Sequence, residues 1–357
     1  LMGGEKKSES LTFEQYSNKD RVMGFKDKSI TPTSNQKNIL TSNNNGTGTV
    51  TQTNEKVSMP KFKVRTVQLF NEALKAEDKE PVYAAGGVNA YKPRLNNGKN
   101  ISFIDYAKGE VTFTNNINQG AGGLYFEGDF TVSSENNATW QGAGVHVSEG
   151  STVTWKVNGV ENDRLSKIGK GTLHIQAKGK NLGSISVGDG KVILDQQADE
   201  NNQKQTFKEV GIVSGRATVQ LNSADQVDPN NIYFGFRGGR LDLNGNSLTF
   251  KRIQNTDEGA MLVNHNATQA SEIIITGSDT TNNQGGDLTN KRDIAFNGWF
   301  GDKDDTKNTG RLNVNYNPLN KDNHFLLSGG TNLKGNITQN GGNLIFSGRP
   351  TPHAYNH

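Results

Sequence analysis

The amino-acid sequence predicts an all-β protein whose short strands stack in the successive coils of a β-solenoid. Apolar and polar residues alternate over short runs, and almost every gap between runs contains Gly, Asn or Asp. These turn signals recur at intervals compatible with coils of roughly 20 to 30 residues. Only 31% of the 357 residues are hydrophobic. Because each coil turns alternate side chains inward, this low fraction can still fill a continuous, narrow core.

One coil can be followed between Tyr233 and Phe250, where the sequence reads YFGFRGGRLDLNGNSLTF. Its three short strands would turn one apolar pair each toward the core: Phe234 with Phe236, Leu241 with Leu243, and Leu248 with Phe250. The polar residues Arg237, Arg240, Asp242 and Asn246 fall at intervening or corner positions. The Gly-Gly and Asn-Gly pairs between the strands supply the positive φ angles that tight corners need.

The N-terminal quarter of the chain differs from the rest. Residues 1–60 are rich in Ser, Asn, Thr and Lys and are expected to form an irregular, poorly ordered junction. Residues 61–96 are expected to form a transition, in which Lys61–Phe70 is a strand and Asn71–Glu80 a short helix that ends before Pro81. From residue 97 to residue 357 the pattern is uniform and predicts a β-helix stalk.

Within the stalk the alternation predicts strands at Ile101–Ile104, Val111–Asn115, Gly123–Phe126, Thr152–Val157, Thr172–Gln176, Ser184–Val187, Val192–Asp195, Thr218–Asn222, Ile273–Thr276, Arg311–Tyr316, His324–Ser328, Asn336–Thr338 and Asn343–Ser347. Two polar stretches, Ala198–Gln205 and Asp279–Gly286, are expected to leave the coil as loops. A β-sandwich also has short strands and frequent turns, but the irregular loop lengths and the corner glycines favour the solenoid.

The charge balance and the cysteine content argue against several classes of function. The sequence has 39 Lys and Arg against 36 Asp and Glu, and the net charge of +3 is too small to indicate a nucleic-acid partner. The absence of cysteine excludes disulfides and thiolate catalysis. No stretch approaches 18 consecutive apolar residues, and the N-terminus has no apolar signal-peptide core. If the protein is exported, we expect its signal to lie outside this chain.

No catalytic, cofactor-binding or metal-binding residue is predicted, and no cofactor is expected. No serine lies in a GDSG or GxSxG motif, so the six histidines are expected at strand or loop positions: His146, His174, His265, His324, His353 and His357. The sequence also lacks the usual His, Cys and acidic metal-binding spacings. Residues Gly169–Thr172 end like a phosphate-binding loop but lack its first glycine, and they are expected to form a corner.

One enzymatic alternative stays open on the solenoid itself. Polysaccharide lyases of the pectate-lyase type need acidic and basic residues clustered on one face, and Asp242, Arg237 and Arg240 are candidates for such a cluster. Surface ion pairs at alternating strand positions are the commoner explanation for this pattern.

Several long stretches resemble the passenger domains of the chymotrypsin-like serine protease autotransporters, the family that includes the immunoglobulin A proteases. They are Asn116–Phe130, Thr139–Val147, Thr152–Val160, Asp163–Leu173, Tyr233–Phe250 and Asn297–Gly301. Arg65–Asn71, Pro93–Asp105 and the closing SGRPTPHAYNH are similar to the adhesion and penetration proteins within this family. The resemblance runs from about Asn43 to His357.

The resemblance implies a secreted protein of a Gram-negative pathogen that is exported through the outer membrane to the cell surface. Such proteins join an N-terminal serine protease domain, a right-handed parallel β-helix stalk and a C-terminal outer-membrane β-barrel. This chain would be the non-catalytic stalk, following a missing protease domain and ending within the stalk, since the catalytic histidine, aspartate and GDSG segments are absent from it. Its partners would be that protease domain, that barrel, and the host epithelial surface or extracellular matrix, with self-association as a further option and no nucleic acid.

Two other functions stay open. In the first alternative, the chain is part of an active serine endopeptidase that is similar to the immunoglobulin A proteases and whose catalytic domain lies elsewhere. In the second, it is a truncated adhesin that acts alone. No proteolytic activity is expected from this chain by itself.

Overall fold

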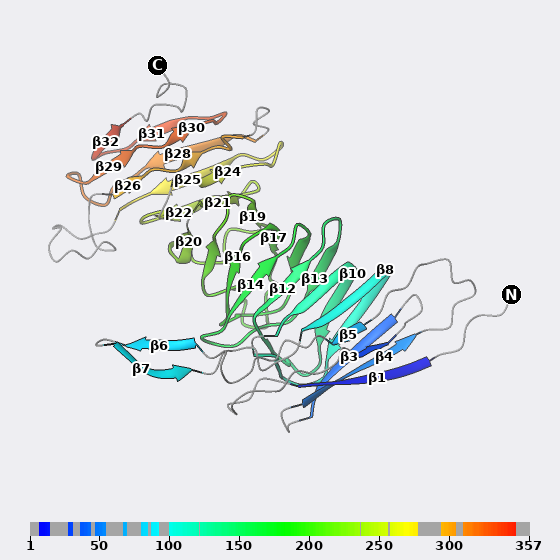
Figure 1. Ribbon diagram of the computed structural model, residues 1–357. Helices are drawn as coiled ribbons and strands as arrows, with labels where there is room; N and C mark the ends of the chain where they lie inside the picture. Colours follow the sequence, from blue (N-terminus) through cyan, green and yellow to red (C-terminus); the bar gives the residue numbers. More distant parts are fainter. Residues whose placement is uncertain are drawn as a thin grey trace, which may run out of the picture. The chain divides into compact units, whose positions relative to one another are not determined.

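The computed structural model describes residues 7–14, 28–30, 36–43, 47–54, 67–69, 80–84, 87–92, 100–120, 122–235, 237–255, 258–277, 294–304 and 310–347 (Figure 1). All regular elements in these ranges are strands, apart from one 3-10 turn, η2 (Pro229–Asn231). The chain forms two compact units: Leu1–Ile185 with Gln196–Lys204, and Ser186–Asp195 with Gln205–His357.

The first unit begins with strands that are mostly antiparallel. They are β1 (Lys7–Glu14), β2 (Lys28–Ile30), β3 (Gln36–Ser42), β4 (Thr47–Asn54), β5 (Val67–Leu69), β6 (Glu80–Ala84) and β7 (Gly87–Lys92). Strand β4 pairs with both β1 and β3 in antiparallel fashion, and β6 pairs with β7. Strand β3 also pairs parallel with β8 (Ile101–Phe113), so this N-terminal sheet continues directly into the first coil.

From β8 onward the strands of the first unit stack in parallel. They are β9 (Ile117–Asn118), β10 (Leu124–Ser134), β11 (Trp140–Gln141), β12 (Gly144–Val147), β13 (Thr152–Trp155), β14 (Arg164–Ile168), β15 (Thr172–Ile175) and β16 (Ser184–Val187). The long strand β10 pairs with β8 over both halves, and its two halves then pair separately with β12 and β13. Two stacks therefore diverge here, β12–β14 and β13–β15, while β9 and β11 form a third.

Aromatic side chains fill much of the core of the first unit. The Trp155 ring packs edge-on against both Phe113 and Trp140, with ring centroids 6.2 and 5.5 Å apart. Both indole N–H groups are satisfied inside: Trp140 donates to the Gln119 side chain at 2.7 Å, and Trp155 to the Val157 carbonyl oxygen at 2.8 Å. The coils thus bury large apolar surfaces without leaving these donors unpaired.

Side chains at the corners link each coil to the next. The backbone N–H of Gly123 donates to Asn100, that of Thr139 to Asn116, and that of Thr152 to Asp129. Each of these bonds joins residues 23 positions apart, within the coil length that the sequence predicts. Asn and Asp therefore stabilise the corners by accepting hydrogen bonds as well as by tolerating positive φ.

The strands of the second unit are also stacked in parallel. Its strands are β17 (Gly190–Leu194), β18 (Val210–Ile212), β19 (Ala217–Leu221), β20 (Ile232–Phe234), β21 (Gly239–Asp242), β22 (Leu248–Phe250), β23 (Gln254–Asn255), β24 (Ala260–Val263), β25 (Ser271–Ile275), β26 (Ile294–Phe296), β27 (Trp299–Phe300), β28 (Leu312–Tyr316), β29 (His324–Leu327), β30 (Gly330–Thr331), β31 (Ile337–Gln339) and β32 (Asn343–Phe346). The stacks run β17–β19–β21–β24–β27–β30, β18–β20–β23, β22–β25–β28–β31 and β26–β29–β32.

Inward positions of these stacks form aliphatic columns. Val192, Val219, Leu241 and Leu262 are paired in register and none of them is exposed to solvent. Each fully buried side chain of this size contributes on the order of 1.5 to 3 kcal/mol. The column therefore holds adjacent coils together even though the overall apolar content is low.

The β-solenoid prediction is confirmed: the described residues make about nine turns of a parallel solenoid. In the coil that begins at Tyr233, Phe234, Leu241, Leu243, Leu248 and Phe250 are all buried, whereas Phe236 lies outside the described residues. Ala198–Gln205 is a loop, and Asp279–Gly286 lies outside the described residues.

The structure also contains strands that the sequence patterns did not predict. Four of them, β1 to β4, fall within residues 1–60, where an irregular segment was expected. Strand β3 was missed because its inward positions, Asn38, Leu40 and Ser42, include two polar residues. In the transition, β5 lies inside the predicted strand Lys61–Phe70, and the predicted helix Asn71–Glu80 lies outside the described residues except for Glu80, which begins β6.

Candidate functional site

The first unit carries a groove on the outer face of four parallel strands. Its volume is about 700 Å³. The lining comes from β8, β10, β12 and β14 and the corners before them: Asn100, Ser102, Ile104, Gly123, Leu124, Tyr125, Ala143, Gly144, Val145, His146, Ser166 and Ile168. The strand register arranges these residues in columns across the strands, so the long direction of the groove crosses the stack of coils.

One column of the groove carries ring and aliphatic side chains. Ser102, Tyr125, His146 and Ile168 occupy equivalent positions on the four strands. The Tyr125 and His146 rings stack with centroids 4.5 Å apart and an interplanar angle of 22°. Ser102 is buried at one end of the column, whereas Ile168 is 50% exposed at the other. Exposure along the column therefore increases from Ser102 on β8 to Ile168 on β14.

The neighbouring column has almost no side chains. Gly123, directly before β10, and Gly144, on β12, occupy it, with Ser166 next on β14. A Cβ atom on Gly144 would lie 2.3 Å from the Ser166 carbonyl oxygen, and one on Gly123 would lie 2.5 Å from the Gly144 carbonyl oxygen. Both positions therefore require glycine, and the backbone itself forms the floor of the groove.

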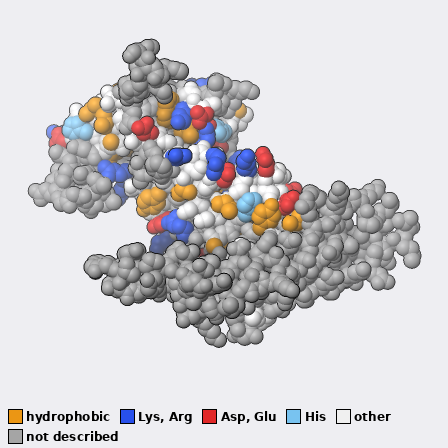
Figure 2. Space-filling model, viewed as in Figure 1, with side chains coloured by type: hydrophobic (Ala, Val, Ile, Leu, Met, Phe, Trp, Pro, Cys, Tyr) orange, Lys and Arg blue, Asp and Glu red, His pale blue; other side chains and the backbone are white. Residues whose placement is uncertain are grey.

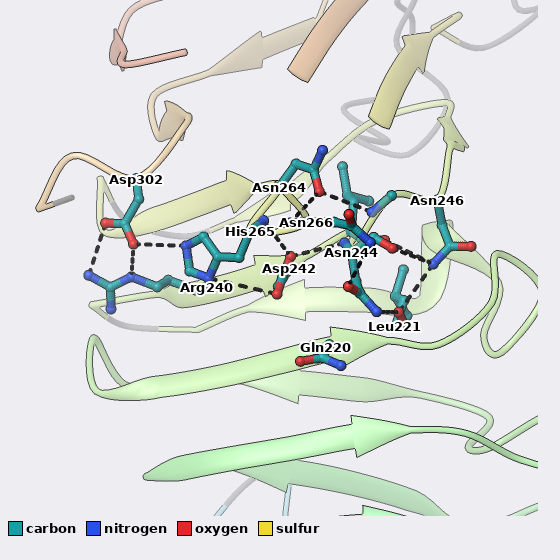
Figure 3. A network of polar contacts seen from close by, with 12 residues as sticks. Gln220, Leu221, Arg240, Asp242, Asn244, Asn246, Asn264, His265, Asn266 and Asp302 are labelled. Atoms are coloured by element: carbon teal, nitrogen blue, oxygen red, sulfur yellow. Dashed lines mark hydrogen bonds and ion pairs between the residues drawn. The ribbon is translucent and has the colours of Figure 1, made fainter. Parts of the chain in front are cut away.

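A second candidate is a network of charged and amide side chains in the second unit (Figure 3). Arg240, on β21, donates through Nε and Nη2 to the two carboxylate oxygens of Asp302 at 2.6 and 3.1 Å. Its Nη2 also donates to Asp304 at 2.8 Å, and its Nη1 to the Gly215 carbonyl oxygen at 3.1 Å. All three guanidinium nitrogens are thus occupied within the protein.

The neighbouring carboxylate of Asp242 is 2% exposed and holds the backbone of two coils. Its Oδ1 accepts hydrogen bonds from the backbone N–H groups of Asn244 at 2.9 Å and His265 at 3.0 Å. The His265 ring lies between two carboxylates, with Nδ1 3.7 Å from Asp242 and Nε2 3.4 Å from Asp302. The network therefore crosslinks β21, the turn after β24 and the segment after β27.

The ion pair shifts the pKa values of Asp302 and Arg240. Burial by itself would raise the pKa of the Asp302 carboxyl, but the Arg240 hydrogen bond, the backbone N–H of Asp304 and the charges of Arg240 and His265 outweigh it and lower this pKa. The hydrogen bond to Asp302 raises the pKa of Arg240 despite partial burial. Both shifts favour the charged, paired state, which is typical of a structural ion pair.

The candidate lyase-like residues Arg237, Arg240 and Asp242 lie in or beside this network. Arg240 and Asp242 lie on the same strand, but each is engaged by other groups of the protein: Arg240 by two aspartates and Asp242 by backbone amides. Arg237 lies at a corner with a φ of 68°. The described contacts thus give Arg240 and Asp242 structural roles in holding coils together.

An asparagine ladder continues the network along the corner. Asn264 is 4% exposed and accepts from the backbone N–H groups of Gly245 and Asn266, both at 3.0 Å. Its Nδ2 donates to the carbonyl oxygens of Gln269 at 2.9 Å and Arg311 at 2.8 Å. One buried side chain therefore links three successive coils with all its hydrogen-bonding capacity in use.

The four histidines in the described ranges lie in separate parts of the fold. His146 stacks in the groove, His265 lies in the charged network, and His174 and His324 are half-buried on β15 and β29. His353 and His357 lie outside the described residues. Across the ranges that the structure describes, no group of three or more His, Cys, Asp or Glu side chains is arranged to hold a metal ion.

Gly169–Thr172 forms a corner, as the sequence analysis predicts. Gly169 has a φ of +82°, and a Cβ on Gly171 would lie 2.2 Å from the Ser148 carbonyl oxygen.

A buried cation, Lys167, lies just before this corner, and the sequence pattern did not indicate it. It points into the core, is completely buried, and donates to the carbonyl oxygens of Gly169 at 2.7 Å and Gly171 at 2.6 Å.

The groove was also missed, although the sequence contains a signal for it. The tetrapeptide Gln-Gly-Ala-Gly occurs at 119–122 and again at 141–144, one coil later, and each copy is followed by an outward ring side chain, Tyr125 or His146.

No described helix is long and apolar enough to cross a membrane. On the face shown in Figure 2, the acidic and basic side chains of the described residues are interspersed rather than gathered by sign.

Comparison with known proteins relates the chain to autotransporters. Residues 310–357 match the family model described as the PIC/HAP1/IgA0 second beta-solenoid repeat region. The chain is 64% identical over 324 residues to an adhesion and penetration protein autotransporter of Haemophilus influenzae, covering 88% of this chain and 23% of that protein. It is 43% identical over 335 residues to an immunoglobulin A1 protease autotransporter of the same species, covering 72% of this chain and 20% of that protein.

A solved structure agrees with these similarities. The crystal structure of the Haemophilus influenzae Hap adhesin superposes with a TM-score of 0.75 at 57% identity, covering 89% of this chain and 35% of that one. The chain spans about a quarter of the length of the curated relatives it matches. Autotransporters of this kind are secreted through the outer membrane to the cell surface, which is the location that the sequence analysis predicts. The chain is therefore a β-solenoid segment of a passenger domain in the autotransporter family that includes the adhesion and penetration proteins and the immunoglobulin A1 proteases.

Proposed function

We propose that this chain is a non-catalytic scaffold that presents an upstream serine protease domain and supports adherence to host epithelial cells or extracellular matrix. The observation that carries the proposal is the internal pairing of the Arg240 network. These charged side chains, the strongest candidates for chemistry in the second unit, are bound to one another and to backbone groups. The relatives whose names describe adhesion and penetration support the adhesive role.

The scaffold role follows from nearest-neighbour stacking. Each coil contacts the coils before and after it, so length can be added without a new core. The outer face offers repeated polar positions for weak multivalent contacts.

We further propose that the protein divides into a junction (residues 1–60), a transition (61–96) and a stalk (97–357). The outer-membrane barrel and the protease domain would be its partners within the same polypeptide, and self-association is a further proposal.

Two assays on the purified chain test this function. Beads coated with the chain should adhere to cultured epithelial cells more than beads coated with an unrelated protein of the same size. The soluble chain should leave casein and immunoglobulin A uncleaved at background rates. Cleavage by the chain alone would overturn the scaffold reading, and failure to adhere would overturn the adhesive role while leaving the scaffold role standing.

A second candidate function is support of an endopeptidase that acts on immunoglobulin A. The 43% identity to immunoglobulin A1 protease autotransporters favours it. In this case the chain would contribute by holding the protease domain, and deletion of the chain from the complete protein would lower cleavage of immunoglobulin A1 more than cleavage of a short peptide. A stand-alone adhesin would instead adhere equally well with or without the remaining domains.

A further inference from the structure

We propose that the groove over β8, β10, β12 and β14 binds an uncharged oligosaccharide that lies along the stack of strands. The inference deepens the proposed adhesive function by giving the class of its ligand, and it rests on that function only for its biological purpose. The binding itself can be tested without cells.

The lining of the groove favours an uncharged ligand. Among the lining residues that the structure describes, none is Asp, Glu, Lys or Arg, and the ionisable side chains in this described part are Tyr125 and His146. A sialylated or sulfated chain would bring anions to a surface whose described lining offers no lysine or arginine, at the cost of their desolvation. Neutral hydroxyl-rich ligands carry no such cost.

The groove combines polar groups with apolar surface in the way that sugars do. The Tyr125 hydroxyl accepts a hydrogen bond from Ser148 Oγ at 3.1 Å, so its own proton can be donated to a ligand. Ser166 is exposed beside the glycine floor, and Ile168 presents an apolar surface on β14. Pockets of mostly apolar lining with a few placed polar groups are typical of small-ligand sites.

The spacing of the coils suits a linear chain of sugar rings. Equivalent positions on adjacent parallel strands repeat about every 4.8 Å along the stack, which is close to the length of one pyranose unit in an extended oligosaccharide. Each coil can therefore offer the same kind of contact to successive rings. Because Gly123 and Gly144 keep the floor at the level of the backbone, rings can lie against it beside the Tyr125 and His146 column.

An extended peptide is a poorer occupant of this groove. Peptides that add to a sheet need a strand edge with unpaired N–H and C=O groups. Here β10 is paired with β8 on one side and β12 on the other, and β12 is paired with both β10 and β14. The groove lies across the faces of these paired strands, so a peptide would find no backbone ladder to join.

The test uses the complete chain on an array of oligosaccharides printed in matched neutral and sialylated pairs. Ser166→Phe would fill the groove from an exposed position, and Tyr125→Ala removes one side of the ring column. The matched control is Thr152→Phe, an exposed position on β13 that does not line the groove. We expect neutral glycans to bind, both groove variants to lose at least about tenfold in affinity, a change of about 1.4 kcal/mol, and the control to bind like the parent.

Several results would overturn the proposal. These are binding of sialylated glycans alone, no binding of any glycan at millimolar concentration, or equal binding by the parent and Tyr125→Ala, provided that circular dichroism shows each variant folded. If peptides selected for binding to the chain are apolar and compete with glycans for the groove, the ligand would be a peptide and not a sugar. If no glycan binds while cells bind the parent and Ser166→Phe equally, the glycan inference fails and the adhesive function stands; if cells bind neither protein, the adhesive function fails independently of the array.

Discussion

The guanidinium of Arg240 forms a two-bond ion pair with the carboxylate of Asp302, 62 residues further along the chain. The side chains are 17% and 8% exposed, so the pair is largely removed from water. It joins the coil that contains β21 to the segment after β27, with β24 between them. A local sequence pattern cannot show this pair, because its partners come together only when the coils stack.

Removing Arg240 is expected to destabilise the second unit. Arg240→Ala would leave the buried Asp302 carboxylate without its cation, which costs roughly 3 kcal/mol. The comparison variant is Arg216→Ala, since the Arg216 side chain is 73% exposed and lies 3.5 Å from Asp189; its loss should cost less than about 1 kcal/mol. Urea denaturation curves of the two variants measure both effects, and similar losses would contradict the assigned role of Arg240.

The ion pair also predicts the response of stability to acid. Because the folded protein lowers the pKa of Asp302, its carboxylate contributes stability above its ordinary pKa of 3.8. This contribution is lost as the pH falls below 3.8 through the lower folded-state pKa. The stability difference between the parent and Asp302→Asn should thus be largest near neutral pH and shrink below 3.8. For the exposed Asp322→Asn the difference should stay small, and a pH-independent difference at Asp302 would contradict this account.

The opposite sign is expected at Asp163. Burial raises the pKa of this carboxyl, although backbone hydrogen bonds from Gly142 and Arg164 partly oppose the rise. Keeping it charged at neutral pH therefore costs stability, which is regained as the pH falls from the raised folded-state pKa toward 3.8. Asp163→Asn keeps an oxygen that can accept these hydrogen bonds and removes the charge. We expect a higher melting temperature than the parent at pH 7 and no advantage at pH 3; a lower melting temperature at pH 7 would refute this.

The buried Lys167 provides a fourth test. Its ammonium group is the donor for the Gly169 and Gly171 carbonyl oxygens in the core of the corner. Lys167→Ala would leave both oxygens without this donor and create a cavity, for a loss of roughly 3 kcal/mol or more. Lys170→Ala, at the exposed position of the same corner, should be nearly neutral. Equal effects in thermal denaturation would show that Lys167 does not hold this corner.

Alanine substitutions at two glycines distinguish the stability cost of backbone strain from that of a steric clash. Gly150 has a φ of +81° with nothing within 4 Å of a Cβ, so Gly150→Ala should cost only about 1 kcal/mol for the left-handed backbone. Gly238 has a φ of +59°, and a Cβ there would lie 2.3 Å from the Ala260 backbone nitrogen in the next coil. Gly238→Ala should cost several-fold more in the same denaturation assay. Equal costs would mean that the close approach of the coils at Gly238 is relaxed easily.

Strand prediction worked best where apolar and polar residues alternate, and failed where core residues break that pattern. Ser184–Val187 was placed without error because Ile185 and Val187 alternate with serines. Strand β14 was missed because Lys167 takes an inward position and Ile168 an outward one. Strand β24 was missed because all four residues of Ala260–Val263 are buried, so no alternation is visible.

The candidate sites were less predictable than the coils. The register of stacked strands decides which outward residues become neighbours, and single-coil patterns do not contain that register. Arg240 and Asp242 were recognised as neighbours because they are two positions apart, whereas Asp302 and His265 come from later coils. The groove likewise depends on four strands whose positions are separated by about one coil each.

The most direct test of the stacked-coil account uses cysteine pairs in this cysteine-free chain. Thr131 on β10 and Thr154 on β13 are direct neighbours in the parallel register, and His174 on β15 lies next to Thr154 in the following coil. The double variant Thr131→Cys with Thr154→Cys should form a disulfide on mild oxidation, since neighbouring strands bring Cα atoms within the range that a disulfide spans. Thr131→Cys with His174→Cys, two coils apart at about 9.6 Å, should not. A disulfide in the second variant and none in the first, detected by mass spectrometry of the folded protein, would contradict the solenoid.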